Sequence, residues 1–121
     1  MMQGVTFRRQ ATLPVTLRLP DQPEFSLEFV IDTGFTESLT LPPAAVAALN
    51  LPFLYNRSVS LADDSVIAIP VHVVTVLWNG LERQVSVLAT GRRPLLGTSL
   101  LDEQELCIQF RENGMVTVEQ L

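Results

Sequence analysis

One tripeptide in the sequence, Asp32-Thr33-Gly34, joins a carboxylate to a glycine directly after the apolar segment Phe29-Val30-Ile31. A carboxylate at the end of a buried strand can serve as a general acid or base when the next loop presents it to a cleft. A glycine two residues later lets a backbone N–H approach that carboxylate closely. The alternative is an aspartate that only caps a turn, and the tripeptide alone favours this alternative because Asp and Gly are common turn residues.

The other reactive residue types favour no second chemistry. The chain has one histidine, His72, and one cysteine, Cys107, so one chain can assemble neither a Cys/His metal cluster nor a disulfide. His72 lies in a β-branched segment and is expected to be a surface or half-buried strand residue. Cys107 is expected to be a small core or interface residue. We therefore expect no metal, no cofactor and no nucleophilic catalysis.

Composition indicates one globular domain, residues 1–121. Apolar residues make up 47% of the chain, the mean hydropathy is +0.29 and the formal net charge is −5. All eight basic residues are arginines, and the pairs Arg8-Arg9 and Arg92-Arg93 are too short to follow a phosphate backbone on an acidic chain. No signal peptide or membrane span is recognised. We expect a cytoplasmic protein without a nucleic-acid or membrane partner.

The N-terminal third alternates with a period of two. Apolar and polar residues alternate through residues 12–19 and 25–31, and a Pro- and Asp-containing turn at residues 20–23 joins them, which predicts a β-hairpin with one buried face. Pro14 lacks an N–H, so its strand is expected to lie at a sheet edge or to contain a bulge there.

Two short helices are predicted. Prolines open and alanines fill residues 42–50, where Asn50 can end the helix. The second is expected within residues 98–105, with Thr98 or Ser99 as N-cap and acidic residues in its first turn.

Three further hairpins are expected along the chain. Asn79-Gly80 carries the strongest turn signal, because a type I′ turn needs positive φ at both central positions. The predicted strand pairs are residues 57–62 with 65–69, 71–78 with 81–89, and 106–111 with 115–119. Together these elements predict a mostly antiparallel all-β fold, a small closed or nearly closed barrel.

Three segments in order, Val30 to Thr36, Leu39 to Pro42 and Leu95 to Leu101, resemble the retropepsin-like aspartic proteases of the small prokaryotic type. In that family an apolar-Asp-Thr-Gly loop is followed later by an apolar-apolar-Gly segment that packs beside it, and then by a short helix. Leu95, the first residue of Leu95-Leu96-Gly97, lies 63 residues after Asp32. The resemblance runs from about residue 12 to the C-terminus and implies a closed antiparallel barrel of the acid-protease type.

The resemblance implies a homodimeric aspartic endopeptidase. Its chemistry needs two carboxylates and the chain has one Asp-Thr-Gly, so Asp32 from each subunit would meet at a two-fold axis. At such a short distance the two carboxylates would share one proton. The ionised one would take a proton from water while the protonated one donates to the scissile carbonyl oxygen of a peptide or unfolded protein substrate.

The resemblance also implies roles for neighbouring residues. Thr33 would hydrogen-bond across the dimer axis, and the N–H of Gly34 would donate to the carboxylate. The tip of the hairpin after residue 57 falls where relatives carry a flap, although a charged tip without glycine is equally typical of a solvated turn. The expected substrate-binding residues are Phe35, Thr36, Ala62, Asp63, Asp64 and Leu96.

Two departures from the family pattern bear on mechanism. Phe35 stands where pepsin-like enzymes have a hydroxyl that bonds the carboxylates. The absence of that hydroxyl predicts activity nearer neutral pH. Thr36 and Thr98 stand where retroviral enzymes have the Asp and Arg of an ion pair, so the dimer contact there is expected to differ.

The terminal segments Val5-Thr6-Phe7 and Val116-Thr117-Val118 are short alternating strands that, as in relatives, are expected to pair between subunits.

A second hypothesis for the function is a catalytically inactive homodimer of the same fold that binds peptides or partner proteins in its cleft. A third is a chain that stays monomeric and does not hydrolyse peptides. Apolar residues expected around the cleft favour apolar side chains beside the cut.

Overall fold

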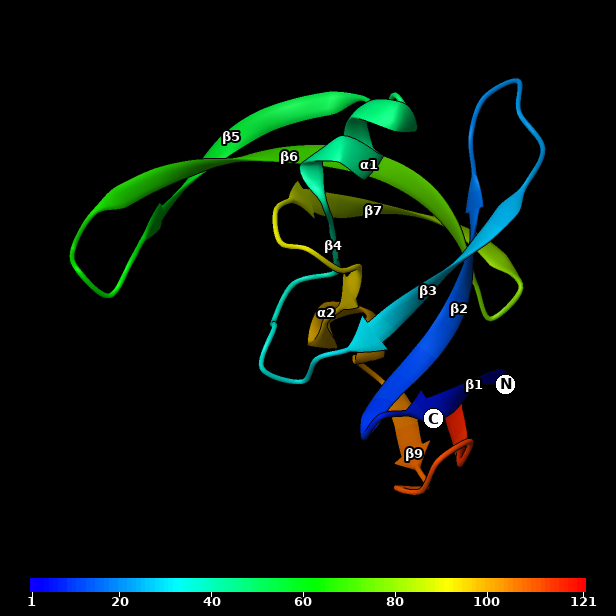
Figure 1. Cartoon of the computed structure of the whole chain (residues 1–121). Helices are drawn as coiled ribbons and strands as arrows, with labels where there is room; N and C mark the ends of the chain where they lie inside the picture. Colours follow the sequence, from blue (N-terminus) through cyan, green and yellow to red (C-terminus); the bar gives the residue numbers. More distant parts are fainter.

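The structure, a computed structural model, describes residues 1–121 and is built from ten strands and two short helices (Figure 1). Strands make up 56% of the chain and helices 8%, which confirms the mostly β fold expected from the period of two. The strands are β1 (Met2–Phe7), β2 (Gln10–Arg18), β3 (Phe25–Ile31), β4 (Leu39–Leu41), β5 (Phe53–Ser60), β6 (Val66–Trp78), β7 (Leu81–Ala89), β8 (Leu95–Leu96), β9 (Gln104–Ile108) and β10 (Met115–Gln120). The helices are α1 (Pro43–Ala48) and α2 (Thr98–Leu101).

All ten strands belong to one sheet, in the order β5-β6-β7-β4-β8-β3-β2-β1-β10-β9, and β6 also pairs with β2. This extra pairing joins β2, β3, β8, β4, β7 and β6 into a ring of strands. Two pairings in the ring, β3 with β8 and β4 with β7, are parallel. The other pairings are antiparallel, so the sheet is mostly antiparallel, as expected. Parallel neighbours need crossover connections, and the chain reaches β4 and β8 through loops rather than through hairpin turns.

The core fills the ring of strands. Leu13, Val15 and Leu17 of β2 are completely buried, and Leu13 is paired with Phe29 of β3, which is also completely buried. Pro14 lies between them in a strand that is not a sheet edge. However, β1 pairs with β2 only up to Thr12 and β6 only from Thr16. On that side Pro14 has no partner strand, which is why a residue without an N–H is tolerated.

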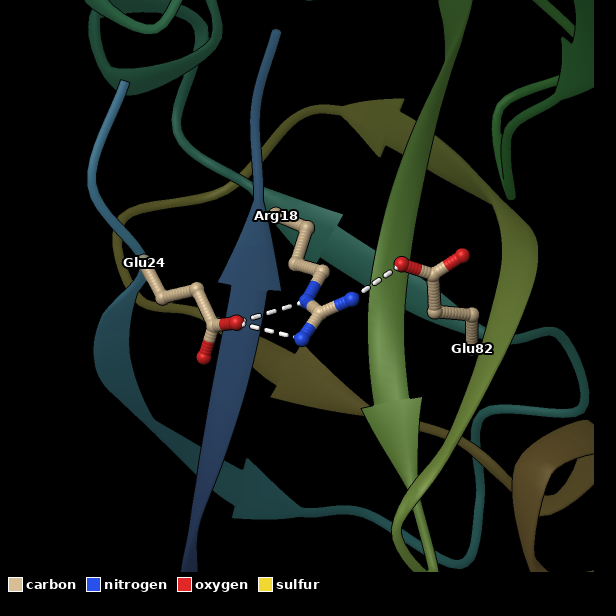
Figure 2. Close-up of polar contacts among 3 residues, drawn as sticks. All are labelled: Arg18, Glu24 and Glu82. Carbon is tan, nitrogen blue, oxygen red and sulfur yellow. Dashed lines mark hydrogen bonds and ion pairs between the residues drawn. The ribbon is translucent and has the colours of Figure 1, made fainter. Parts of the chain in front are cut away.

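An ion-pair network sits beside the seam where β2 meets β6. Arg18, at the end of β2, donates from Nε to Glu24 Oε1 at 2.7 Å and also pairs with Glu82 of β7 (Figure 2). The two carboxylates raise the pKa of Arg18 above its ordinary value, Glu82 most strongly. The network is exposed, so it orients the β2–β3 and β6–β7 hairpins more than it stabilises them.

The structure confirms the first predicted helix and corrects the second. α1 spans Pro43–Ala48, and Asn50, with φ of 52°, follows its end as expected. α2 is only four residues long. Its N-cap is Gly97 and its first turn has no acidic residue, so the expected N-cap at Thr98 or Ser99 and the expected acidic first turn are wrong. It stops because Asp102 is extended and Glu103 has φ of 61°. The residues that follow form β9, whose half-buried Leu106 and Ile108 lie opposite buried residues of β10.

The two chain termini meet within one molecule (Figure 1). β1 pairs with β10 from Met2↔Val118 to Val5↔Met115, and β10 pairs with β9 on its other side. The expectation that the terminal strands pair between subunits is therefore wrong, because their backbone groups already bond inside the chain. The free edges of the sheet are β5 and β9.

β5 and the first part of β6 leave the ring as a two-stranded arm (Figure 1). The arm covers residues 53–70, and most of its side chains are exposed on both faces. Its large exposed apolar residues are Phe53, Leu54, Tyr55, Leu61, Val66 and Ile67. A two-stranded ribbon is marginal in water by itself, so the arm has a surface suited to a partner or ligand.

Replacing Leu17 by alanine is expected to lower the free energy of unfolding by about 2–5 kcal/mol. Leu17 is completely buried and is paired with completely buried Val76 at the seam that closes the ring, so truncation leaves a cavity. Chemical denaturation followed by circular dichroism measures the change.

Leu81→Ala is the matched control for that substitution. Leu81 is 74% exposed, so its truncation is expected to change stability by less than about 0.5 kcal/mol. Equal losses in the two variants would contradict the placement of the core at the seam.

Candidate active site

The loop from Asp32 to Ser38 is held by the short strand β8, which lies between the two strands that flank the loop. β3 enters the loop and pairs with β8 in parallel, and β4 leaves it and pairs with β8 on the other side. The Asp32 N–H donates to the Leu96 carbonyl at 2.9 Å, and the Gly97 N–H donates to the Ser38 carbonyl at 2.8 Å. The two ends of the loop are thereby fixed to two adjacent residues of the distant segment, Asp32 to Leu96 and Ser38 to Gly97.

The middle of the loop is bonded to the start of α2. The Thr98 N–H donates to the Phe35 carbonyl at 2.8 Å, and the Ser99 N–H to the Glu37 carbonyl at 3.3 Å. A side chain at Gly97 would place its Cβ 2.1 Å from the Glu37 carbonyl oxygen and 2.6 Å from the Phe35 carbonyl oxygen. Only glycine therefore allows this approach of the two backbones.

Asp32 stands at the start of the loop, directly after β3, and its side chain is half-buried. Its Oδ1 accepts the Gly34 N–H at 2.9 Å, and its carbonyl accepts the Phe35 N–H at 3.1 Å. The carboxylate is thus oriented by its own loop, as the resemblance implies for Gly34. Thr33 and Gly34 are exposed beside it.

Asp32 lines an open cavity of about 420 Å³, here called the Asp32 cavity. The apolar part of its wall includes Ile31, Leu95 and Phe110, and its polar part consists of Arg9, Gln10, Arg93 and Asp32 itself. An oriented carboxylate on a solvent-accessible cavity can accept a proton from, or donate one to, a bound molecule.

The sequence did not indicate that Arg9 and Arg93 belong to this site. Arg9 comes from the turn between β1 and β2, and Arg93 from the segment before β8, so only the fold brings them to Asp32. Arg93 Nη1 donates to Gln10 Oε1 at 2.6 Å. The arginine pairs were visible in the sequence, but their only recognised use was phosphate binding, for which they are too short.

The predicted substrate-binding residues divide into three groups. Phe35 is half-buried and Thr36 exposed, both in the loop after Asp32. Leu96 is corrected by the structure, because its side chain is completely buried in the core and its neighbour Leu95 lines the Asp32 cavity instead. Side chains alternate along a strand, so only one of the two leucines can face the cavity.

The residues Ala62, Asp63 and Asp64 lie at the tip of the arm, and the tip stands apart from the Asp32 loop in the single chain (Figure 1). The tip is ordered by its own bonds, with Asp63 Oδ1 accepting the Ser65 N–H at 3.0 Å and the Ser65 hydroxyl at 2.5 Å. Near its base, the arm is tied to the loop by the ion pair of Arg57 with Glu37. Glu37 and, less strongly, Tyr55 raise the pKa of Arg57.

The other candidate residues lie outside this site. His72 is half-buried in β6, as expected, and its Nδ1 lies 3.0 Å from the Leu51 carbonyl oxygen. Cys107 is exposed on edge strand β9, so of its two expected positions, core or interface, the core position is wrong and the interface position stays a prediction. No group of three or more His, Cys, Asp or Glu side chains is placed to hold a metal ion.

Comparison with known proteins identifies no relative: neither a protein-family model nor a curated protein matches the chain. Neither helix is long and apolar enough to cross a membrane. Any function must therefore be inferred from the geometry of the Asp32 loop and its surroundings.

Replacing Gly97 by alanine is expected to lower the free energy of unfolding by about 1–3 kcal/mol, the usual cost of inserting an atom into packed structure. The new Cβ would meet backbone oxygens of the Asp32 loop rather than a movable side chain. Denaturation midpoints and backbone amide shifts of residues 32–38 measure the effect.

Gly34→Ala is the matched glycine control. A Cβ at Gly34 would meet only Asp32 Oδ1, at 3.3 Å, so its effect on stability is expected to stay below about 0.5 kcal/mol. If Gly97→Ala is as mild as Gly34→Ala, β8 does not hold the loop as described.

Replacing Ser65 by alanine is expected to raise the pKa of Asp63 back toward its ordinary value. The Ser65 hydroxyl and then the Ser65 N–H lower the pKa of Asp63 by bonding its charged form, and the substitution removes the stronger bond. An NMR titration of the Asp63 carboxyl measures the shift, with Ser58→Ala on the same arm as the control. An unchanged pKa would show that the tip is not ordered by this bond.

Proposed function

We propose that this protein is a homodimeric aspartic endopeptidase of the retropepsin-like type, small prokaryotic branch, which hydrolyses peptide bonds in extended peptides or unfolded proteins. Its reactive group is a pair of Asp32 carboxylates, one from each subunit. The fold we assign to it is the closed acid-protease barrel, supported by the ring of strands around the core.

One observation carries the proposal: a distant apolar-apolar-Gly strand grips both ends of the Asp-Thr-Gly loop. The resemblance calls for Leu95-Leu96-Gly97 to pack beside Asp32. The hydrogen bonds from the Asp32 N–H to the Leu96 carbonyl and from the Gly97 N–H to the Ser38 carbonyl are of that kind. A turn that merely capped a strand would not need this support. Holding a carboxylate rigidly is what general acid–base catalysis requires.

The need for a second subunit follows from the count of carboxylates in the site. Within one chain, Asp32 is the only acid on its cavity, whereas peptide hydrolysis through an activated water needs a base and an acid together. A two-fold axis next to the exposed loop would supply the second carboxylate as Asp32 of the partner subunit. The pair then shares one proton, so one member activates water and the other protonates the carbonyl oxygen.

The neighbouring residues take supporting roles in this proposal. Thr33 is exposed next to Asp32 and is proposed to hydrogen-bond the partner's loop. Phe35 packs against Gly97, since a Cβ there would lie 2.6 Å from its ring, so it supports the loop from behind with no hydroxyl to offer the carboxylates. This arrangement supports activity nearer neutral pH than in pepsin-like enzymes.

The arm is proposed to close over the bound peptide as a flap. Its exposed apolar residues, on both faces of a two-stranded ribbon, suit contact with an extended chain and with the second subunit. The Arg57–Glu37 ion pair couples the arm to the Asp32 loop. The tip residues Ala62, Asp63 and Asp64 would come near the site only when the arm moves or the dimer forms.

Asp32→Asn is expected to abolish cleavage, because an amide can neither accept the proton from water nor share one with its partner. The test incubates a diverse peptide library with wild type and variant from acidic to neutral pH, at several protein concentrations. Specific activity is expected to rise with concentration, since only the dimer carries a complete site.

Asp21→Asn is the matched control for this experiment. Asp21 is exposed in the β2–β3 turn with φ of 58°, which Asn also adopts, so cleavage should persist. Absence of cleavage by wild type under conditions where ultracentrifugation shows a dimer would overturn the proposal in favour of the non-cleaving peptide-binding dimer.

A further inference from the structure

The Asp32 cavity is basic, although the chain as a whole carries a net charge of −5. Two arginines, Arg9 and Arg93, are among the residues that line it, together with one acidic residue, Asp32. The ion pairs of the chain involve only Arg18 and Arg57. Arg9 and Arg93 therefore keep uncompensated positive charges at the cavity wall.

Arg93 is held in place by a neutral partner. Its Nη1 donates to Gln10 Oε1 at 2.6 Å, which orients the guanidinium without cancelling its charge. The other N–H groups of a guanidinium stay available, and their planar arrangement suits a carboxylate. Arg93 is therefore oriented but forms no ion pair, so it can bind an anion.

The backbone at Arg9 points the same way. Arg8 and Arg9 both have positive φ, 49° and 66°, a conformation that residues other than glycine and asparagine adopt at a cost. The β6–β7 turn has the same signs of φ, 50° and 79°, but uses the favoured pair Asn79-Gly80. Arginine at the second position is poor turn chemistry, and it places a cation on the Asp32 cavity.

The two arginines of the turn have different surroundings. The guanidinium of Arg8 lies over the Phe7 ring, 5.1 Å from its centroid, and Arg8 does not line the cavity. Arg9 does line it. The strained turn thus commits one arginine to a neighbouring ring and the other to the site.

We propose that the Asp32 cavity binds a carboxylate of the substrate through Arg93 and Arg9, so that this protein selects peptides with an acidic residue, Glu or Asp, beside the bond it cleaves. The apolar wall, with Ile31, Leu95 and Phe110, receives the methylene groups of the side chain. This preference departs from the apolar one that the sequence favours.

The carboxylate of Asp32 does not outweigh the two arginines. The inference rests on the proposed function, in which the two Asp32 side chains share a proton and carry about one negative charge between them. Each subunit contributes its own Arg9 and Arg93, so the positive charges exceed the negative one. The symmetric dimer carries one such cavity on each side of the scissile bond.

The test compares kcat/KM for matched peptides that carry Glu or Gln next to the cleavage site. Wild type is expected to prefer Glu, and Arg93→Gln is expected to reduce that preference about tenfold, the effect of losing one charge-assisted hydrogen bond. Arg93→Glu is expected to reverse the preference toward Lys. The wild-type preference should shrink with added salt.

Arg92→Gln is the matched control, because Arg92 is exposed next to Arg93 but does not line the cavity. Circular dichroism checks that every variant is folded. A further pair of peptides has Gln at the site and differs only in a free or an amidated C-terminus. This pair distinguishes recognition of a side-chain carboxylate from recognition of a terminal one. Discrimination only between these C-termini would overturn the assignment to an acidic side chain.

A binding measurement separates failure of this inference from failure of the proposed function. Fluorescence anisotropy records binding of the Glu and Gln peptides to the full-length Asp32→Asn protein, with and without Arg93→Gln. Cleavage by wild type without an Arg93-dependent Glu preference overturns the inference and leaves the protease intact. Arg93-dependent preference in binding without any cleavage by wild type supports the carboxylate site and overturns the protease. Absence of both overturns both.

Discussion

The pairing of the short strand β8 with both strands that flank the Asp32 loop is the constraint on which the rest of the molecule depends. β8 has two residues, yet it pairs with β3 in parallel and with β4 on its other side. The same segment, through Gly97, Thr98 and Ser99, bonds the loop between those strands. Since β3 and β4 belong to the ring around the core, the position of Asp32 is tied to the most buried part of the protein.

The ring and the arm divide the chain into a rigid and an adaptable part. Leucine, valine and phenylalanine side chains fill the ring, and several are completely buried. The arm, by contrast, has partly or fully exposed residues along most of its length and is held mainly by its own ladder. The Asp32 carboxylate therefore lies next to the buried ring, whereas the largest group of exposed apolar side chains lies on the ribbon.

Charge is distributed in the same uneven way. The acidic chain collects unpaired arginines on the wall of the Asp32 cavity, while two other arginines, Arg18 and Arg57, are used in ion pairs that link secondary-structure elements. The turn that supplies Arg9 has a strained backbone where the β6–β7 turn has Asn-Gly. Local strain next to a cavity is more readily understood as part of a site than as a requirement of the fold.

The sequence by itself determined the elements whose signals are local. Alternation of apolar residues predicted β2 and β3, and the prolines before the alanine run predicted α1. Asn79-Gly80 predicted the turn between β6 and β7, although the segments 65–69 and 71–78, expected as two strands, form the single strand β6. These patterns depend on neighbours within a few residues, so they can be recognised without the fold. Asp32 and the glycine that bonds it were recognised for the same reason.

Only the tertiary structure decided the features that depend on pairing between distant segments. α2 ends after four residues because the chain that follows is drawn into the ladder of β9 and β10, and the terminal strands pair with each other rather than with another subunit. Leu96 and Leu95 look alike in the sequence, but the pairing of β8 turns the first into the core and the second to the cavity. Arg9 and Arg93 are far apart in the chain and line one cavity with Asp32 because long-range strand pairing places four separate segments around it, which no local pattern records.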